Sequence, residues 1–177
     1  MAVLEIRQLG DGVLRGKAAP VRRISRSVKA LLDDMAETMY AAKGAGLAAP
    51  QVGVAKRIVV IDAGDGLIEL INPRLTRLEG EEGAVEGCLS IPEYIGYVRR
   101  ANRAEAEALN RNGEKIWIAG EGLLARALQH EIDHLDGILF VDRAEKLYKN
   151  EPAADAVEEQ AAPDAEAADG TAASEAE

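Results

Sequence analysis

Apolar residues recur at intervals of three and four in residues 25–44, and this spacing predicts an amphipathic helix. Ser25 or Ser27 is expected to cap its start, and Gly44 or Gly46 is expected to end it. The methionines of the apolar face are interpreted as core residues, because methionine fills irregular space between packed elements. That face consists of Val28, Leu31, Leu32, Met35 and Met39.

The same spacing predicts a second helix in residues 121–137, which includes the sequence HEIDH at residues 130–134. Gly137 is expected to end this helix, because glycine readily adopts the left-handed conformation that closes many helices. The buried side of the helix is predicted to hold Leu124, Leu128, Ile132 and Leu135.

Two extended segments are predicted between the helices. Residues 57–62 (RIVVID) and 67–72 (LIELIN) are apolar runs, and a Gly-Asp-Gly sequence at residues 64–66 separates them. Short apolar runs bounded by turn residues are typical of strands. We therefore expect two neighbouring strands here.

A hairpin is predicted around an Asn-Gly pair at residues 112–113. Alanine and glutamate alternate over residues 104–108, and the apolar run KIWI occupies residues 115–118. Trp117 is interpreted as a packing residue. The combined pattern predicts one α+β domain, in which antiparallel sheets pack around the central helix that carries residues 130–134.

The acidic charge of the chain is concentrated at its C-terminal end. The formal net charge is -10, but residues 151–177 hold nine of the 31 acidic residues and none of the 21 basic ones. Residues 1–150 therefore keep 22 acidic against 21 basic residues, which leaves no basic stripe for direct nucleic-acid binding. The Ala-, Glu- and Asp-rich segment 151–177 is predicted to be a disordered tail beyond a folded domain of residues 1–150, because it has too little apolar surface to offset its ordering entropy.

The cysteine count and the distribution of apolar residues favour a cytoplasmic location. A single cysteine excludes an internal disulfide, which fits a reducing compartment. The N-terminal residues show no long apolar run behind a basic start, so no secretory signal is expected. No run of about 18 apolar residues occurs, so no membrane span is expected.

The candidate chemistry begins with HEIDH, which contains both histidines of the chain. A helix has about 3.6 residues per turn, so His130 and His134 project from nearly the same face and can bind one metal ion. Glu131 lies a step around the helix, where its carboxylate can take a proton from a metal-activated water. The HExxH pattern also occurs by chance, so the motif alone leaves a purely structural helix open.

Two further segments could complete a metal site. Cys88, in EGCLS at residues 86–90, is a candidate third ligand, although a lone cysteine is often a small buried apolar residue. The glycines of GAGLAAPQVG, residues 44–53, would let a backbone approach a ligand closely, and Gln51 offers amide donors. Taken alone, this segment is interpreted as a turn between a helix and a strand, and a functional role is the alternative.

Together, GAGLAAPQ (44–51), EGCLS (86–90) and HEIDH (130–134) resemble, in order and spacing, the three motifs of the peptide deformylase family. The resemblance covers about residues 3–148. It implies a hydrolase that removes the formyl group from the N-terminal formyl-methionine of nascent polypeptides and releases formate. A monomer without direct nucleic-acid or membrane partners is expected, and a transient contact with the ribosome is left open.

The resemblance also implies one metal ion per chain, held by Cys88, His130 and His134. The ion is expected to be Fe(II), with Zn, Ni or Co able to replace it. A thiolate suits both Fe(II) and Zn(II), so the ligand type alone does not select one of them. A cysteine-ligated Fe(II) site is expected to be sensitive to oxygen.

The remaining site residues follow from the same resemblance. Glu131 is implied as the general acid and base. The side-chain amide of Gln51 and the backbone N–H of Leu89 are implied as donors to the oxyanion that forms during hydrolysis. Gly46 is implied as a contact for the backbone of the substrate.

Two acidic residues within the motifs are expected to have supporting roles. Glu86 is predicted to pair with Arg99 or Arg100 and to steady the loop of the candidate cysteine ligand. An exposed ion pair of little consequence is the alternative. Asp133 is expected to face away from the histidines and to have a structural role.

Two other functions fit parts of this pattern. A zincin-type endopeptidase also uses HExxH, but it takes its third ligand from a Glu or His downstream, and residues 136–150 offer no His and no well-spaced Glu. A noncatalytic deformylase-like binding protein is expected to lose Glu131, Cys88 or Gln51, and all three are present.

An acidic tail would be repelled by ribosomal RNA phosphates, so docking on the ribosome through the tail is not expected.

Overall fold

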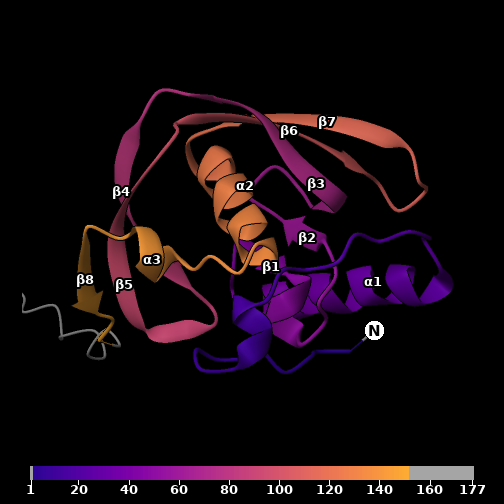
Figure 1. Cartoon of the computed structure of the whole chain (residues 1–177), viewed down its shortest axis with the longest axis horizontal. Helices are drawn as coiled ribbons and strands as arrows, with labels where there is room; N and C mark the ends of the chain where they lie inside the picture. The colour runs from indigo at the N-terminus through magenta and orange to yellow at the C-terminus, as the bar shows by residue number, and fades with distance from the viewer. Residues whose placement is uncertain (1, 152–177) are drawn as a thin grey trace, which may run out of the picture.

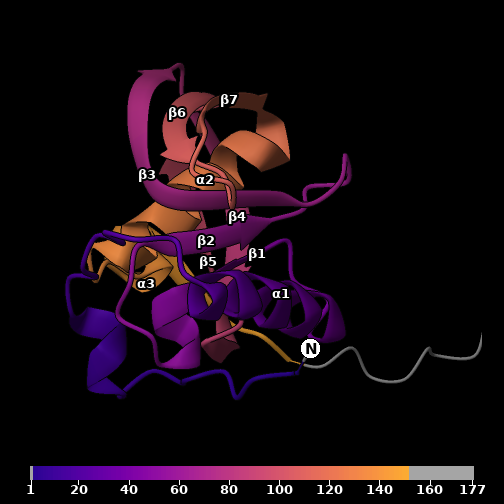
Figure 2. The same ribbon diagram turned by 90° about the vertical axis from the view of Figure 1, so that its right-hand side faces the viewer.

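The structure, a computed structural model, describes residues 2–151 (Figures 1 and 2). Its elements, in chain order, are η1 (Gly12–Arg15), α1 (Arg26–Ala41), β1 (Gly46–Ala48), η2 (Ala49–Val52), β2 (Ile58–Ile61), β3 (Ile68–Glu79), β4 (Glu82–Cys88), β5 (Ile91–Arg100), β6 (Arg103–Leu109), β7 (Lys115–Glu121), α2 (Gly122–Leu135), α3 (Phe140–Arg143) and β8 (Lys146–Lys149).

Two antiparallel sheets surround helix α2. One sheet has the strand order β1-β2-β3-β6-β7, and the other has the order β4-β5-β8. Helix α2 packs against all five strands of the larger sheet, and Figure 1 shows it between that sheet and strands β4 and β5. The predicted α+β architecture around the helix of residues 130–134 is confirmed.

Strand β2 is buried on both faces, which explains why its sequence is apolar without alternation. Successive side chains of a strand point to opposite faces of the sheet. Val59 and Ile61 belong to the cluster that contains the apolar side of α2, whereas Ile58 and Val60 belong to the cluster of α1. Figure 2 shows the two helices on opposite sides of β2. The core is therefore a helix–sheet–helix sandwich at this point.

The start of α1 agrees with the prediction, but its end does not. Ser25 caps the helix, and its hydroxyl oxygen accepts a hydrogen bond of 3.3 Å from a backbone N–H of the first turn. The expected end at Gly44 or Gly46 is wrong. The helix ends at Ala41, because Lys43 takes the left-handed conformation with a φ of 55°. The Gly44 N–H then donates a 2.9 Å hydrogen bond to a carbonyl of the last helical turn.

Helix α2 agrees with the second predicted helix. Leu128, Ile132 and Leu135 are buried in the core and Leu124 is partly buried against it. Gly137 follows the helix with a φ of 75°, the left-handed conformation expected of it.

The hairpin between β6 and β7 is confirmed, but the role given to Trp117 is wrong. Gly113 lies in the turn with a φ of 78°, and the two strands pair in register on either side of it. Trp117 is 68% exposed. Its neighbours Ile116 and Ile118 pack towards the core, so the side chain between them points outwards from this edge strand.

Several strands are longer than the sequence pattern indicates or are not indicated by it. Strand β3 continues to Glu79, beyond the predicted end at residue 72, and β4, β5 and β8 have no counterpart among the predicted elements. Within the described residues, no helix has both the length and the apolar character needed to cross a bilayer. The prediction of a disordered tail concerns residues that, from 152 onwards, lie outside the described part of the chain.

Candidate active site

Three potential metal ligands converge at the C-terminal half of α2. Cys88 is the last residue of β4, and His130 and His134 lie one turn apart on α2. The Sγ of Cys88 is 3.4 Å from Nε2 of His134, which is 3.3 Å from Nε2 of His130. One ligand atom of each residue lies within 4.8 Å of the others. The three ligands predicted from the sequence are therefore brought together.

The spacing of these atoms fits a metal ion. Nitrogen and sulfur ligands of one tetrahedral ion lie about 3.3 to 3.6 Å apart, given metal–nitrogen distances of about 2.0 Å and metal–sulfur distances of about 2.3 Å. The two measured separations, 3.3 and 3.4 Å, match this spacing. Burial lowers the pKa of His134 well below its ordinary value, which favours the neutral imidazole that a metal requires.

Glu86 orients His130 by contacting its Nδ1, the ring nitrogen on the side away from the metal position. Its Oε1 lies 2.7 Å from Nδ1 of His130, so a proton on Nδ1 leaves Nε2 free to face the metal position. Burial alone would raise the pKa of Glu86, but hydrogen bonds from His130 and Arg100 hold it well below its ordinary value. For His130, burial alone would lower the pKa, but hydrogen bonds with Cys88 and Glu86 raise it to about 10 in the metal-free site, so a bound metal ion must displace a proton from Nε2.

Of the two predicted partners of Glu86, Arg99 and Arg100, it is Arg100 that forms the pair, and the pair is buried. Arg100 donates bonds of 2.8 and 2.7 Å from Nε and Nη2 to the two oxygens of Glu86. Arg126, on α2, adds a third bond of 2.6 Å to the same carboxylate. Arg99 instead pairs with Glu145. Because Glu86 joins β4, β5 and α2, the alternative of an exposed and inconsequential ion pair is wrong.

Asp133 has the structural position expected of it. Its carboxylate accepts a 3.0 Å bond from Arg100 and bonds of 2.6 and 3.0 Å from Arg143, which follows in α3. It therefore neutralises the far side of the same arginine that holds Glu86. These paired charges connect the back of the histidine site to two strands of the smaller sheet, β4 and β5, and to helices α2 and α3.

Glu131 is a buried carboxylate with a free oxygen. Burial raises its pKa to about 7. Among the described residues, none donates a hydrogen bond to its Oε2. Its other oxygen packs against Gly46, which has no side chain to displace it. A buried carboxyl group with a pKa near neutrality can accept a proton at one stage of a reaction and return it at another.

Gln51 and Leu89 lie on the opposite side of the ligands. The Oε1 of Gln51 accepts a 2.9 Å bond from the Ala48 N–H, which turns its amide nitrogen towards Sγ of Cys88 at 3.5 Å and Oγ of Ser90 at 3.2 Å. Leu89 lies in the turn between β4 and β5 and lines the cavity. Ser90 was missed by sequence reasoning, although it belongs to the same EGCLS motif.

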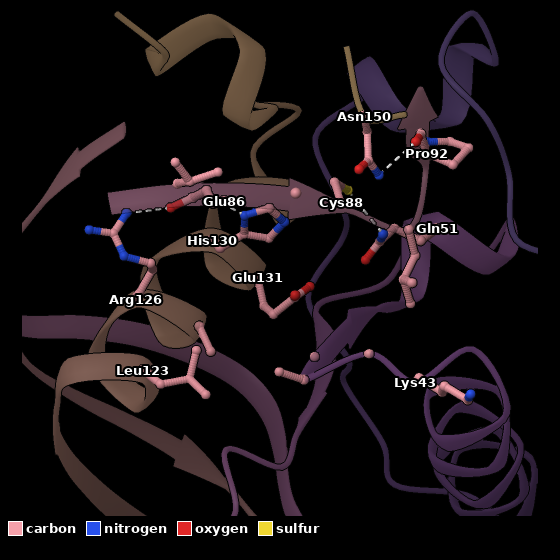
Figure 3. Close-up of a pocket in the computed structure, with 17 residues that line it drawn as sticks. Lys43, Gln51, Glu86, Cys88, Pro92, Leu123, Arg126, His130, Glu131 and Asn150 are labelled. Atoms are coloured by element: carbon pink, nitrogen blue, oxygen red, sulfur yellow. Dashed lines mark hydrogen bonds and ion pairs between the residues drawn. The ribbon is translucent and has the colours of Figure 1, made fainter. Parts of the chain in front are cut away.

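A cavity of about 460 Å³ opens over these residues (Figure 3). It lies between β1 and β4, and each of these strands is the outermost strand of its sheet. Gly46, Gln51, Cys88, Leu89, His130 and Glu131 all line it, while His134 is buried beneath. Sequence reasoning missed the other walls, which are formed largely by Lys43, Val85, Pro92, Leu123, Arg126 and Asn150.

Comparison with protein families gives one consistent result. Residues 3–150 match the family model described as polypeptide deformylase. The peptide deformylase of Acetivibrio thermocellus is 63% identical over 143 residues, which are 81% of this chain and 84% of that protein. The peptide deformylase of Desulfitobacterium hafniense is 59% identical over 146 residues, which are 82% and 97% of the two chains.

Solved structures agree with the sequence comparison. The peptide deformylase of Thermotoga maritima has a TM-score of 0.80 and 41% identity, and the match covers 82% of this chain and all of the other (100%). A peptide deformylase from Synechococcus elongatus, in complex with actinonin, has a TM-score of 0.79 and 44% identity, with 82% and 81% of the two chains covered.

Proposed function

This chain belongs to the polypeptide deformylase family, and we propose that the cavity beside α2 is where it carries out the family's reaction. It is a metal-dependent hydrolase that removes the N-formyl group from the formyl-methionine at the start of newly made proteins. The products are formate and a free amino terminus. The observation that carries the assignment of the cavity is the convergence of Cys88, His130 and His134 on one point beside the buried carboxylate of Glu131.

The metal ligands in this proposal are Cys88, His130 and His134, one ion to each chain. When bound, a divalent ion supplies a Lewis acid that brings the pKa of a water molecule close to neutrality. Glu86 fixes the tautomer of His130, and Arg100 and Arg126 hold Glu86 in place. We propose Fe(II) as the native ion, with Zn, Ni or Co as substitutes, because a thiolate with two imidazoles suits each of them.

Glu131 is assigned the proton transfers. Glu131 lines the cavity, and its buried Oε2 receives no hydrogen bond from residues 2–151, so it can accept the proton of the attacking water. The water oxygen bonds to the formyl carbon, and the carbonyl electrons move to the formyl oxygen. The Gln51 amide and the Leu89 N–H are assigned as donors to that oxygen. Glu131 then returns the proton to the amine nitrogen as the carbon–nitrogen bond breaks.

The cavity accepts the methionine and the chain that follows it. An extended peptide placed between the open edges of β1 and β4 can use their free backbone groups, as an added strand does. Gly46 is assigned to this backbone contact. Leu123 and Val85 offer apolar surface for the methionine side chain. Such a site recognises the N-terminal end of a peptide and not its full sequence.

The endopeptidase alternative has less support. It calls for a third ligand downstream of the HExxH helix, whereas the ligand group within residues 2–151 uses Cys88, which precedes the helix. We further propose that the enzyme acts as a cytoplasmic monomer on nascent chains. We do not assign ribosome docking to the acidic segment beyond residue 150, since its charge opposes contact with RNA.

The test is formate release from a short N-formyl-methionyl peptide by protein loaded anaerobically with Fe(II). The parent is expected to release formate, and Glu131→Ala is expected to lose about 10²- to 10⁴-fold in kcat while retaining its metal. Metal content is measured on both proteins to separate loss of the ion from loss of the base. A folded, metal-loaded parent that releases no formate would overturn the proposed function.

A further inference from the structure

The cavity carries one exposed charged side chain that the reaction does not use. Three of its ionisable residues, Glu86, His130 and Glu131, are buried. A fourth, Arg126, donates hydrogen bonds to Glu86 and to two backbone carbonyls. Cys88 is the proposed thiolate ligand, and the remaining one is Lys43, which is exposed and lies at the periphery of the site, away from His130 and Cys88 (Figure 3).

The backbone holds Lys43 in a conformation that usually favours glycine. Its φ is 55°, and its N–H donates a 3.0 Å bond to the Tyr40 carbonyl. The N–H of Gly44 bonds to the Met39 carbonyl at 2.9 Å, so the turn is tied to α1 on both sides. A lysine at a left-handed position, where glycine would be less strained, points to a use for that side chain.

Lys43 also lies along the path that the substrate takes away from the reacting atoms. The wall of residues 44–46 leads from Lys43 to Gly46, which contacts Glu131. Three residues separate Lys43 from Gly46, so the chain places them at most about 11 Å apart, and three residues of an extended peptide cover about 10 Å. Lys43 therefore lies beside one of the three residues that follow the formyl-methionine.

We propose that Lys43 gives this enzyme a preference for substrates with an acidic side chain within the three residues after the formyl-methionine. The inference rests on the proposed function of the cavity. The ammonium of Lys43 makes no ion pair with any carboxylate of residues 2–151, so its charge is available to the substrate. The other charged residues that line the cavity are paired or buried. Among the residues that the structure describes, Lys43 is therefore the one charged group of the cavity that is available to pair with an acidic side chain of the substrate.

The experiment uses formyl-methionyl tetrapeptides that carry Glu, Gln or Lys at position 2, 3 or 4, with the metal-loaded full chain. At one of these positions the parent is expected to show a kcat/KM about twofold to fivefold higher for Glu than for Gln, the effect of one exposed ion pair. The preference is expected to disappear in Lys43→Gln, to reverse in Lys43→Glu and to persist in Lys43→Arg. Added salt is expected to weaken it.

Lys56→Gln is the matched control, because it removes the same charge from an exposed site outside the cavity and should keep the parent's preference. Lys43→Gly tests the charge without strain on the left-handed backbone if Lys43→Gln folds poorly. Equal kcat/KM values for Glu and Gln at all three positions, or a preference unchanged in the Lys43 variants, would overturn the inference. Hydrolysis of the Gln peptides reports on the proposed function separately.

Discussion

The carboxylate of Glu131 packs directly against the backbone of Gly46, and its Oε1 lies 2.6 Å from the point that a Cβ on residue 46 would occupy. This contact joins the proposed base on α2 to the first residue of β1. Real Cβ atoms do not approach an oxygen so closely. Glycine at position 46 therefore serves the placement of Glu131 as well as any contact with the substrate.

Gly46→Ala is expected to lower kcat by about 10²-fold, because the new methyl group must push the carboxylate from its position. The matched control is Gly44→Ala, whose Cβ would come too close only to the Leu89 side chain, at 2.7 Å from Cδ1, and would make an ordinary contact of 3.6 Å with the Gly46 carbonyl oxygen. That side chain can rotate away, so a loss of less than about tenfold is expected. Steady-state kinetics of both variants would show the contrast, and equal losses would contradict it.

Glu86→Ala is expected to weaken metal binding about 10- to 100-fold, because His130 loses the acceptor that orients it. It also removes one of the two carboxylates that pair with the buried Arg100 and leaves only Asp133, which is expected to cost up to about 3 to 5 kcal/mol of stability. Competition with a chelator and urea denaturation measure the two effects. The control is Glu107→Gln, which breaks a pair with the exposed Arg74 and should change stability by less than about 1 kcal/mol. Equal metal retention in both variants would contradict the role of Glu86.

Glu131→Gln is expected to stabilise the metal-free protein above neutral pH. The pKa of Glu131 rises from 4.5 to about 7 on burial, so the folded state binds more protons than the unfolded state between these pH values. Stability is therefore lost as pH rises from about 4.5 to 7, by up to about 3 kcal/mol. Denaturation at pH 8 should favour Glu131→Gln, and the difference should shrink towards pH 5. A difference that does not change with pH would contradict the prediction.

Metal removal is expected to expose the thiol of Cys88 to chemical modification. The chain has one cysteine, so a thiol reagent reports on this site alone. In the loaded enzyme the thiolate is occupied by the ion, and little reaction is expected. After chelation, one thiol per chain should react, and formate release should be lost in parallel. Full reaction of the loaded enzyme would show that Cys88 is not a ligand, and Cys88→Ala provides the blank.

The sequence predicts the parts of this structure that depend on local periodicity. Both main helices and the apolar strand at residues 58–61 follow from the spacing of large apolar residues. Strands β4 and β5 are not predicted from the sequence, because glycines and charged residues interrupt the pattern of apolar residues along them. Two charged side chains of these strands, Glu86 and Arg100, point into the protein and form a buried pair. A pattern of alternating apolar and polar residues does not indicate such a pair.

The candidate site shows the same division. The ligand residues stand out because few residue types bind metals and the chain has only one cysteine and two histidines. The choice of Arg100 over Arg99 depends on which face of β5 each side chain takes, and therefore on the register between β4 and β5. Lys43 is also invisible to motif reasoning, since its position depends on where α1 ends.

The two ends of the ligand set are 46 residues apart in the chain, and they belong to different halves of the fold. Cys88 lies on the β4–β5 hairpin, and His134 lies on the helix that packs against the larger sheet. No fragment that lacks either half can hold the ion with all three ligands. An enzyme that works on unfinished proteins must therefore itself be complete before it can start, and a fully ligated metal ion marks a molecule that has reached that state.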